Sequence, residues 1–204
     1  MNFASRWGWA DFYISVGFRP MPMYGLFGGD RCNCGSTECR PGKHARPEVE
    51  AAWKEGAEYT PGDFTERDNI AIALGPWGGS DDWLVCLDLD GPFPVEQYLA
   101  LPPTLEQKSP RGRHLFFTVP PYAPLGNWVD CFLTKYSEGS ALDIRYARGR
   151  VNVAPSRTLH GGYEWGPFRE PAPLPQAAID VVLNRRVERG LPVQWEWDRG
   201  GKRP

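Results

Sequence analysis

The chain has 204 residues, of which 41% are hydrophobic, and a formal net charge of −2 at pH 7. This length and composition are enough for one domain with a full hydrophobic core, or for one domain with a small appendage. No apolar stretch approaches the roughly 18 residues that a transmembrane helix needs, so the sequence argues against a membrane protein. The nearly balanced charge argues against a protein that grips duplex nucleic acid over its whole surface, and any such contact is expected to be local.

Taken in chain order, the pattern of apolar and polar residues predicts a mixed α+β fold. Helical spacing and capping residues predict helices over residues 3–16, 48–55, 95–101 and 175–189. Short apolar runs predict strands over residues 69–74, 83–89, 114–119, 141–145 and 151–154. The segment between the first two helices, to about residue 47, is rich in Pro, Gly and Cys and is expected to be irregular.

Three thiols and one imidazole fall within thirteen residues of this irregular segment: Cys32, Cys34, Cys39 and His44. Their number and type match a structural zinc site, in which four protein ligands leave no open position on the metal. Glycine and proline between them allow the chain to fold the ligands into a tetrahedron. We therefore predict a small zinc knuckle at about residues 30–46 that binds Zn²⁺ in a structural role.

A disulfide is the alternative interpretation of these cysteines. It would require an oxidising compartment, and the chain has an odd number of cysteines, five. Residues 1–13 contain charged and aromatic residues without the apolar run of a signal peptide, which favours zinc. Cys86 and Cys131 lie in apolar runs and are expected to be ordinary buried thiols.

An acidic pair, Asp88 and Asp90, lies at the end of the predicted strand 83–89. Because successive side chains of a strand alternate between its faces, these two carboxylates point the same way. Asp143 lies in a second apolar run and is expected to complete the group. Carboxylates that share a site repel one another, and hard cations such as Mg²⁺ or Mn²⁺ prefer oxygen ligands, so the pattern indicates a divalent metal site.

Each of these residues also has a simpler interpretation. Asp88 and Asp90 would be common residues before the turn at Gly91, and Asp143 would form a plain ion pair with Arg145 or Arg113.

The segment from Lys108 to His114 supplies the positive charge that such a site would need. Arg111 and Arg113 suit bidentate recognition of phosphate, and Ser109 and His114 can each donate a hydrogen bond to a phosphate oxygen. Gly112 permits a tight turn and a close approach of the backbone. Together with the aspartates, this segment indicates metal-assisted phosphoryl transfer.

In their order and spacing, these motifs resemble the archaeo-eukaryotic primase superfamily, and within it the bifunctional primase-polymerase domain of phage and plasmid replication proteins. Asp88–Asp90 resembles the first motif, Ser109–His114 the second, and Asp143–Arg145 the third, within a resemblance that covers roughly residues 10–170. Similar Cys/His knuckles occur in some members of that family.

The resemblance implies an archaeo-eukaryotic primase-like catalytic core, with mixed and antiparallel sheets flanked by helices and a zinc-knuckle insertion. Residues 1–190 would form the catalytic domain, and residues 191–204 a linker or tail toward a further domain. The implied activity is that of a DNA-directed nucleotidyltransferase, a primase-polymerase that uses nucleoside triphosphates on a single-stranded DNA template. Such a protein would be encoded by a phage or plasmid and would act in the cytoplasm of the bacterial host. Its expected partners are a helicase domain or replication proteins, and no membrane is involved.

The resemblance also assigns roles to residues. Asp88, Asp90 and Asp143 would hold two Mg²⁺ or Mn²⁺ ions for catalysis. The triphosphate of the nucleotide would be bound by Ser109, Arg111, Arg113, His114 and Arg145.

Two other functions remain compatible with the same residues. A metal-dependent nuclease would use the three carboxylates to activate water. A non-catalytic, zinc-containing single-strand-binding module would instead use arginines and aromatic rings, for which Trp77 and Trp128 in loops rich in Gly and Pro are candidates.

Overall fold

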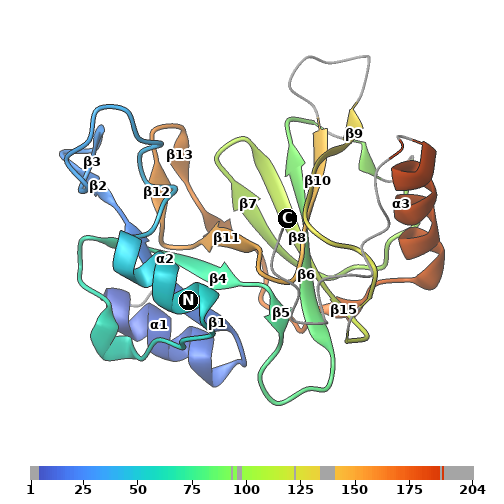
Figure 1. The fold of residues 1–204 in the computed structure, drawn as a ribbon, viewed down its shortest axis with the longest axis horizontal. Helices are drawn as coiled ribbons and strands as arrows, with labels where there is room; N and C mark the ends of the chain where they lie inside the picture. The colour runs from blue at the N-terminus through green and yellow to red at the C-terminus, as the bar shows by residue number, and fades with distance from the viewer. Residues whose placement is uncertain are drawn as a thin grey trace.

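A computed structural model describes residues 5–92, 94–95, 98–121, 123–133, 141–188 and 190, and it has the predicted α+β character. Two sheets stand side by side, one antiparallel and the larger one antiparallel except for one short parallel strand, with helices at both ends of the molecule (Figure 1). In the described part of the chain the helices are α1 (Arg6–Ser15), α2 (Pro47–Lys54) and α3 (Gln176–Glu188), with a 3₁₀ turn at Pro61–Asp63. Within the described ranges, no helix combines the length and the apolar character needed to cross a membrane.

The smaller sheet has the strand order β1 (Arg19–Tyr24), β4 (Asp68–Ala73) and β11 (Arg150–Val153). The larger sheet has the order β14 (Glu164–Trp165), β7 (Leu105–Ser109), β8 (Gly112–Val119), β6 (Trp83–Asp90), β10 (Ala141–Arg145) and β9 (Trp128–Leu133). Two short strands extend it, β5 (Gly75–Pro76) beside β6 and β15 (Ala172–Pro173) beside β8. Two small hairpins complete the fold, β2 (Leu26–Phe27) with β3 (Arg31–Cys32), and β12 (Arg157–Thr158) with β13 (Gly161–Gly162).

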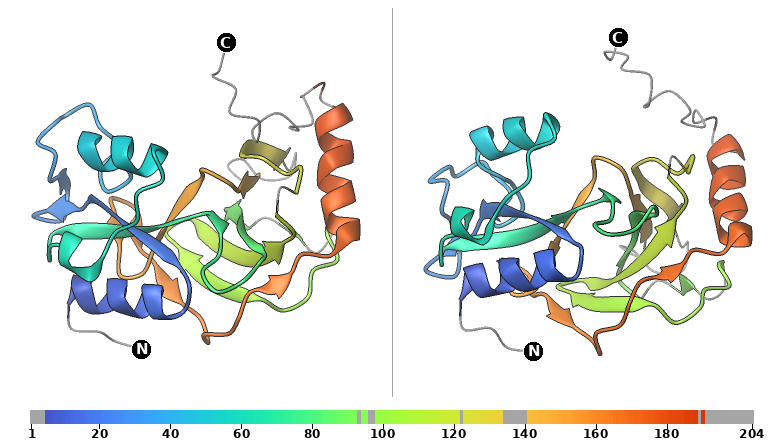
Figure 2. Two further views of the ribbon diagram at one scale, coloured as in Figure 1. Left: turned by 60° about the horizontal axis from the view of Figure 1, so that its bottom comes forward. Right: turned by 90° about the horizontal axis from the view of Figure 1, so that it is seen from below.

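The larger sheet is covered on its two faces by different parts of the chain. One face carries Leu87, Leu89 and Leu115 into a core that α3 closes with Ile179 and other apolar residues. The opposite face packs with α1 and the smaller sheet in a second core, and Figure 2 shows α1 and α3 at opposite ends of the molecule. A third, small core lies between α2 and the smaller sheet. The second core joins the two sheets into one body.

Local sequence explains where the helices begin and end. Ser5 caps α1 by accepting a hydrogen bond from the backbone N–H of Gly8. Pro47 begins α2, Glu48 lies in its first turn and Lys54 in its last, which suits the helix dipole.

Apart from the two-residue strands, three of the described strands lie where the sequence analysis expected none. The segment predicted to be irregular to about residue 47 contains β1, whose Pro20 and Pro22 cannot donate to a ladder, and among the described strands β1 pairs only with β4. The other two are β7 and β9.

The stacking role predicted for Trp128 is wrong, because it lies in β9 with 6% of its surface exposed. Trp77 is partly buried, and its indole N–H donates to the carbonyl of Val16. The predicted tail over residues 191–204 and part of the predicted helix 95–101 lie outside the described residues.

Ser156 provides a test of the junction between the chain after β11 and β4. Its hydroxyl accepts from the N–H of Ile70 and donates to the carbonyl of the same residue, both at 2.8 Å, in a fully buried position. Ser156→Ala would leave two buried backbone groups without partners, so we expect the free energy of unfolding to fall by about 2–4 kcal/mol. Urea denaturation measures this loss.

Ser15→Ala is the matched control, since the Ser15 hydroxyl bonds only to an exposed carbonyl, that of Phe12, among its described contacts. We expect the control to change stability by less than about 0.5 kcal/mol. Equal losses in the two variants would contradict the role of Ser156.

Candidate active site and Cys/His cluster

The candidate active site is a row of side chains that crosses the middle of the larger sheet. In the antiparallel register, Asp88 of β6 lies opposite His114 of β8 on one side and opposite Asp143 of β10 on the other. In-register residues of neighbouring strands share a face, so these three side chains lie next to one another. Asp90 lies two residues further along β6 on the same face, opposite Gly112. The structure therefore brings the three predicted aspartates and the predicted histidine together.

Each carboxylate of this row contacts a cationic or polar partner. Oδ1 of Asp88 lies 3.1 Å from Nε2 of His114. The guanidinium of Arg145 lies between two acids, with Nη2 at 2.6 Å from Oδ2 of Asp143 and Nε at 3.8 Å from Oδ2 of Asp88. The ion pair that the sequence offered as the simpler interpretation of Asp143 is thus present, and the same arginine also reaches Asp88.

The turn between β7 and β8 brings a second arginine to the site. Nη2 of Arg111 lies 2.8 Å from Oδ2 of Asp90. Gly112 allows the turn to close onto β6, since a Cβ atom there would lie 1.9 Å from the carbonyl oxygen of Leu89. Ser109 ends β7 opposite Gly112 and is buried.

Arg113 does not join this group. It neighbours His114 on β8 and therefore points to the opposite face of the sheet, where its Nη1 lies 3.8 Å from Oε1 of Glu106. Of the two arginines that flank Gly112, the structure places Arg111 beside the aspartates.

The two acids of β6 differ in their electrostatics. Burial acts to raise the pKa of Asp88, but His114, Arg145 and Lys43 outweigh it and lower that pKa. Burial raises the pKa of Asp90, and the charge of Asp88 raises it further, while Arg111 opposes the change. Asp90 is therefore the carboxylate of the pair whose negative charge is less completely neutralised.

The donor set suits a hard divalent cation. The carboxylates of Asp88, Asp90 and Asp143 lie on adjoining strands and offer oxygen ligands. The charge of Asp88 helps to raise the pKa of Asp90, and the guanidinium of Arg145 lies between Asp88 and Asp143. Within the described ranges, the three carboxylates are not grouped as closely as metal ligands, and arginine side chains lie against Asp90 and Asp143. Binding of Mg²⁺ or Mn²⁺ by Asp88, Asp90 and Asp143 therefore stays a prediction.

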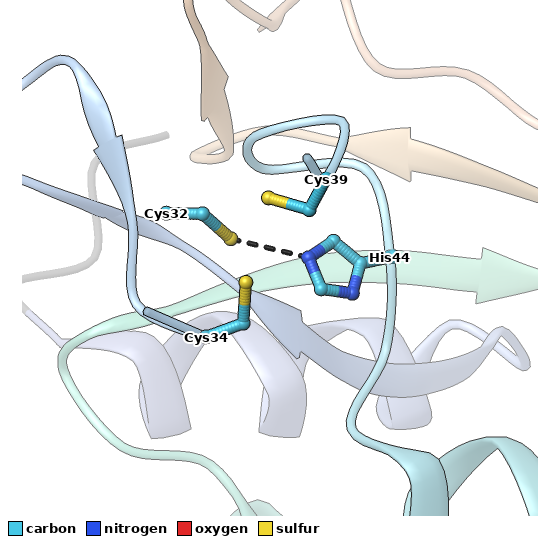
Figure 3. A group of neighbouring side chains, drawn as sticks. All are labelled: Cys32, Cys34, Cys39 and His44. Carbon is cyan, nitrogen blue, oxygen red and sulfur yellow. Dashed lines mark hydrogen bonds between the residues drawn. The ribbon is translucent and has the colours of Figure 1, made fainter. Parts of the chain in front are cut away.

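The Cys/His cluster forms around β3, at the opposite end of the molecule from α3 (Figure 1). The thiols of Cys32, Cys34 and Cys39 and the ring of His44 point toward one another (Figure 3), and their ligand atoms all lie within 4.8 Å of one another. Sγ of Cys32 lies 3.2 Å from Nε2 of His44. In tetrahedral zinc sites the metal–ligand bonds are about 2.0–2.3 Å, which puts neighbouring ligand atoms about 3.5–4 Å apart. The four residues therefore fit Zn²⁺, and all of these thiols are free.

The loop that carries this cluster also reaches the active site. Burial and the charge of Arg111 lower the pKa of Lys43, while the carboxylates of Asp88 and Asp90 act to raise it. Lys43, which directly precedes the zinc-ligand candidate His44, therefore lies within electrostatic range of the acidic pair.

The sequence analysis missed several residues that surround the site. Gln107 contacts His114 directly, and the carbonyl of Asn152 accepts a hydrogen bond from Gln107. The ring centroid of Tyr163 lies 5.6 Å from that of His114. Alternation along β7 places Gln107 on the same face as Ser109, so recognising this strand would have revealed it.

Comparison with known protein families gives one match. A family model described as "Bifunctional DNA primase/polymerase, N-terminal" matches residues 2–177. This segment contains the acidic row, the basic turn and the Cys/His cluster. A search of curated proteins finds no match.

The zinc assignment can be tested by metal content. We expect the purified chain to bind about one Zn²⁺. Cys34→Ser should weaken zinc affinity by at least a hundredfold, whereas loss of a group that only hydrogen-bonds to a ligand typically weakens it by about 10- to 100-fold. Elemental analysis and competition with a chromophoric chelator measure both, and removal of zinc should lower the melting temperature.

Cys131→Ala is the control, because Cys131 is buried in the core under α3. It should lower stability while leaving the zinc content unchanged. A wild-type chain without zinc, or an unchanged affinity in Cys34→Ser, would contradict the assignment.

Proposed function

Because the chain belongs to the bifunctional DNA primase/polymerase family, we propose that it is a DNA-directed nucleotidyltransferase that builds strands on a single-stranded DNA template from nucleoside triphosphates. The observation that supports this most is the row of His114, Asp88 and Asp143 across three neighbouring strands, with Asp90 beside it. It combines oxygen ligands with N–H donors on one face of a sheet, which is what transfer of a nucleotidyl group requires.

The acids would hold the cations of the reaction. Two divalent ions bound by Asp88, Asp90 and Asp143 would lower the pKa of an attacking hydroxyl and neutralise the leaving pyrophosphate. The carboxylates need no covalent role, because positioning and charge stabilisation account for most of the catalysis in such transfers. The hydroxyl belongs to a primer end during extension, or to a second nucleotide when a strand is started.

The cations of the site would bind the triphosphate. Arg111 lies at the exposed rim beside Asp90, and Arg145 lies deeper, between Asp88 and Asp143. Both guanidinium groups offer several N–H donors in a planar fork that suits phosphate oxygens. His114 and Ser109 would add neutral donors, and Lys43 a further charge from the Cys/His loop.

The wider setting follows the family resemblance. A source in a phage or plasmid, the cytoplasm of a bacterial host, and a helicase domain or other replication proteins as partners stay predictions of that resemblance. Residues 191–204 would then lead toward such a domain.

Primer extension tests the proposal. With Mg²⁺ or Mn²⁺, nucleotides and a primed single-stranded template, we expect extension by the wild-type chain and a fall of at least about a hundredfold in Asp88→Asn. Glu106→Gln is the matched control, since this carboxylate belongs to the neighbouring β7 but lies with Arg113 on the other face of the sheet. It should extend at nearly the wild-type rate.

The alternatives give different products in the same assay. Shortening of the DNA in place of synthesis would establish a nuclease. Binding of single strands that needs no divalent ion and survives Asp88→Asn, without any product, would establish a binding module.

The two arginines beside Gly112 provide a second test. Arg111→Ala should raise the KM for the nucleotide by about 10- to 100-fold, the usual effect of a lost hydrogen bond to a charged group. Arg113→Ala should leave that KM within about threefold, because its side chain lies on the opposite face. Steady-state kinetics at varied nucleotide concentration measure both values. Equal effects of the two changes would contradict the assignment of Arg111.

A further inference from the structure

A buried chain of amide groups runs from the Cys/His loop to the acidic row. The carbonyl of Gly42, two residues before His44, accepts from Nδ2 of Asn152 at 2.6 Å. The backbone carbonyl of Asn152 accepts from Nε2 of Gln107 at 2.8 Å, and the same Nε2 lies 2.7 Å from Nδ1 of His114. The other ring nitrogen of His114 faces Asp88. Gln107 is fully buried and contacts His114 on the side of the ring opposite Asp88.

The surroundings of Gln107 fix the orientation of its amide. Its Oε1 accepts from the backbone N–H of Ala154 at 3.3 Å, and its Nε2 donates to the carbonyl of Asn152. The reverse orientation would set an oxygen against that carbonyl and an NH₂ group against an N–H, which removes both bonds. The amide nitrogen therefore faces His114.

This orientation determines which nitrogen of His114 carries the proton. An amide NH₂ has two hydrogens and no acceptor, and one of its hydrogens is used by Asn152. The second can bond to Nδ1 of His114 only if Nδ1 is bare, since an N–H there would oppose an N–H of Gln107. The proton of the neutral ring is then on Nε2, which lies 3.1 Å from Oδ1 of Asp88.

We infer that Gln107 is a positioning residue that holds His114 in its Nε2–H tautomer and directs this N–H at the acidic row. The carboxamide has no donor to spare and touches neither the acids nor the exposed surface, so it acts through the ring. The benefit for the reaction rests on the proposed function, because the N–H that Gln107 orients is the one available to Asp88 or to a phosphate oxygen of the nucleotide.

The tautomer is observed directly by NMR. The chain has three histidines, so a long-range ¹H–¹⁵N spectrum of histidine-labelled protein is simple, and loss of one ring's signals in His114→Asn assigns it. In the wild type we expect a protonated Nε2 and a bare Nδ1 at His114. Gln107→Glu places a hydrogen-bond acceptor beside Nδ1 of His114 and should therefore bring a proton to Nδ1. Gln107→Met has a side chain of similar volume but offers His114 no hydrogen-bond partner, so it should give a mixture of the two tautomers.

Asn152→Ala is the matched control. It removes the side-chain contact with Gly42 but keeps the backbone carbonyl that Gln107 uses, so the tautomer of His114 should stay as in the wild type. Gln107→Met should also lower kcat/KM for extension by about two- to tenfold, the range for one neutral hydrogen bond. Circular dichroism confirms that each variant is folded, and Gln107→Met, without a buried charge, keeps the measurement possible if Gln107→Glu does not fold.

Several results would overturn the inference. These are a wild-type His114 protonated on Nδ1, an unchanged tautomer in Gln107→Met, or an equal change in Asn152→Ala. Unchanged extension in a Gln107→Met chain whose tautomer has shifted would remove the role in the reaction. Because the spectrum needs no activity, a wild-type chain that makes no DNA but shows the expected tautomers would disprove the proposed function and leave the positioning by Gln107 standing.

Discussion

The antiparallel register of β8, β6 and β10 is the constraint on which the rest of the site depends, because it alone brings His114, Asp88 and Asp143 side by side. A slip of one residue would send every side chain to the other face. Leu87 and Leu89 would then lie among the arginines, and the aspartates would enter the apolar core under α3. Burial of a leucine is worth about 1.5–3 kcal/mol and burial of an unpaired carboxylate is strongly unfavourable, so the hydrophobic pattern that folds the sheet also fixes the site.

Within that frame, the balance of burial against neighbouring charge distinguishes the two acids of β6. Asp88 contacts His114 and lies near Arg145, whose side chain is 29% exposed, and these two contacts overcome the cost of burial. Asp90 is paired with Arg111, whose side chain is 55% exposed, so solvent screens the pair more strongly. Burial and the repulsion from Asp88 then prevail, and the pKa of Asp90 rises. The free protein thus keeps one acid well neutralised and leaves its neighbour in need of a cation, which is the condition under which added positive charge is most favourable.

Much of this could be predicted from local patterns, since β6, β8 and β10 are apolar runs and the Cys/His ligands are close in sequence. The predictions that failed concerned features that depend on how the strands pair. The two prolines of β1 argued against a strand, but they are tolerated there because β1 pairs with only one of the described strands. In β7, the buried face carries the polar residues Gln107 and Ser109, so the strand lacks the usual alternation of apolar and polar residues. Arg113 was grouped with Arg111 by proximity along the chain, although alternation from His114 already directs it to the other face. Alternation along β7 would place Gln107 on the face of Ser109, but its hydrogen-bond partners Asn152 and Ala154 lie far along the sequence and could not be predicted.

Those distant contacts also explain why the Cys/His loop and the acidic row form one unit. The carbonyl of Gly42 accepts from the side chains of both Asn69 and Asn152, in a buried position beside β4 and β11 of the smaller sheet. Moving the loop would leave these amides without partners at a cost of about 1–3 kcal/mol each. A metal that fixes Cys32, Cys34, Cys39 and His44 would therefore also fix Gly42 and Lys43, and with Lys43 a positive charge near the acidic row. Zinc would thus stabilise the attachment of the loop to the smaller sheet, although it lies outside the acidic row.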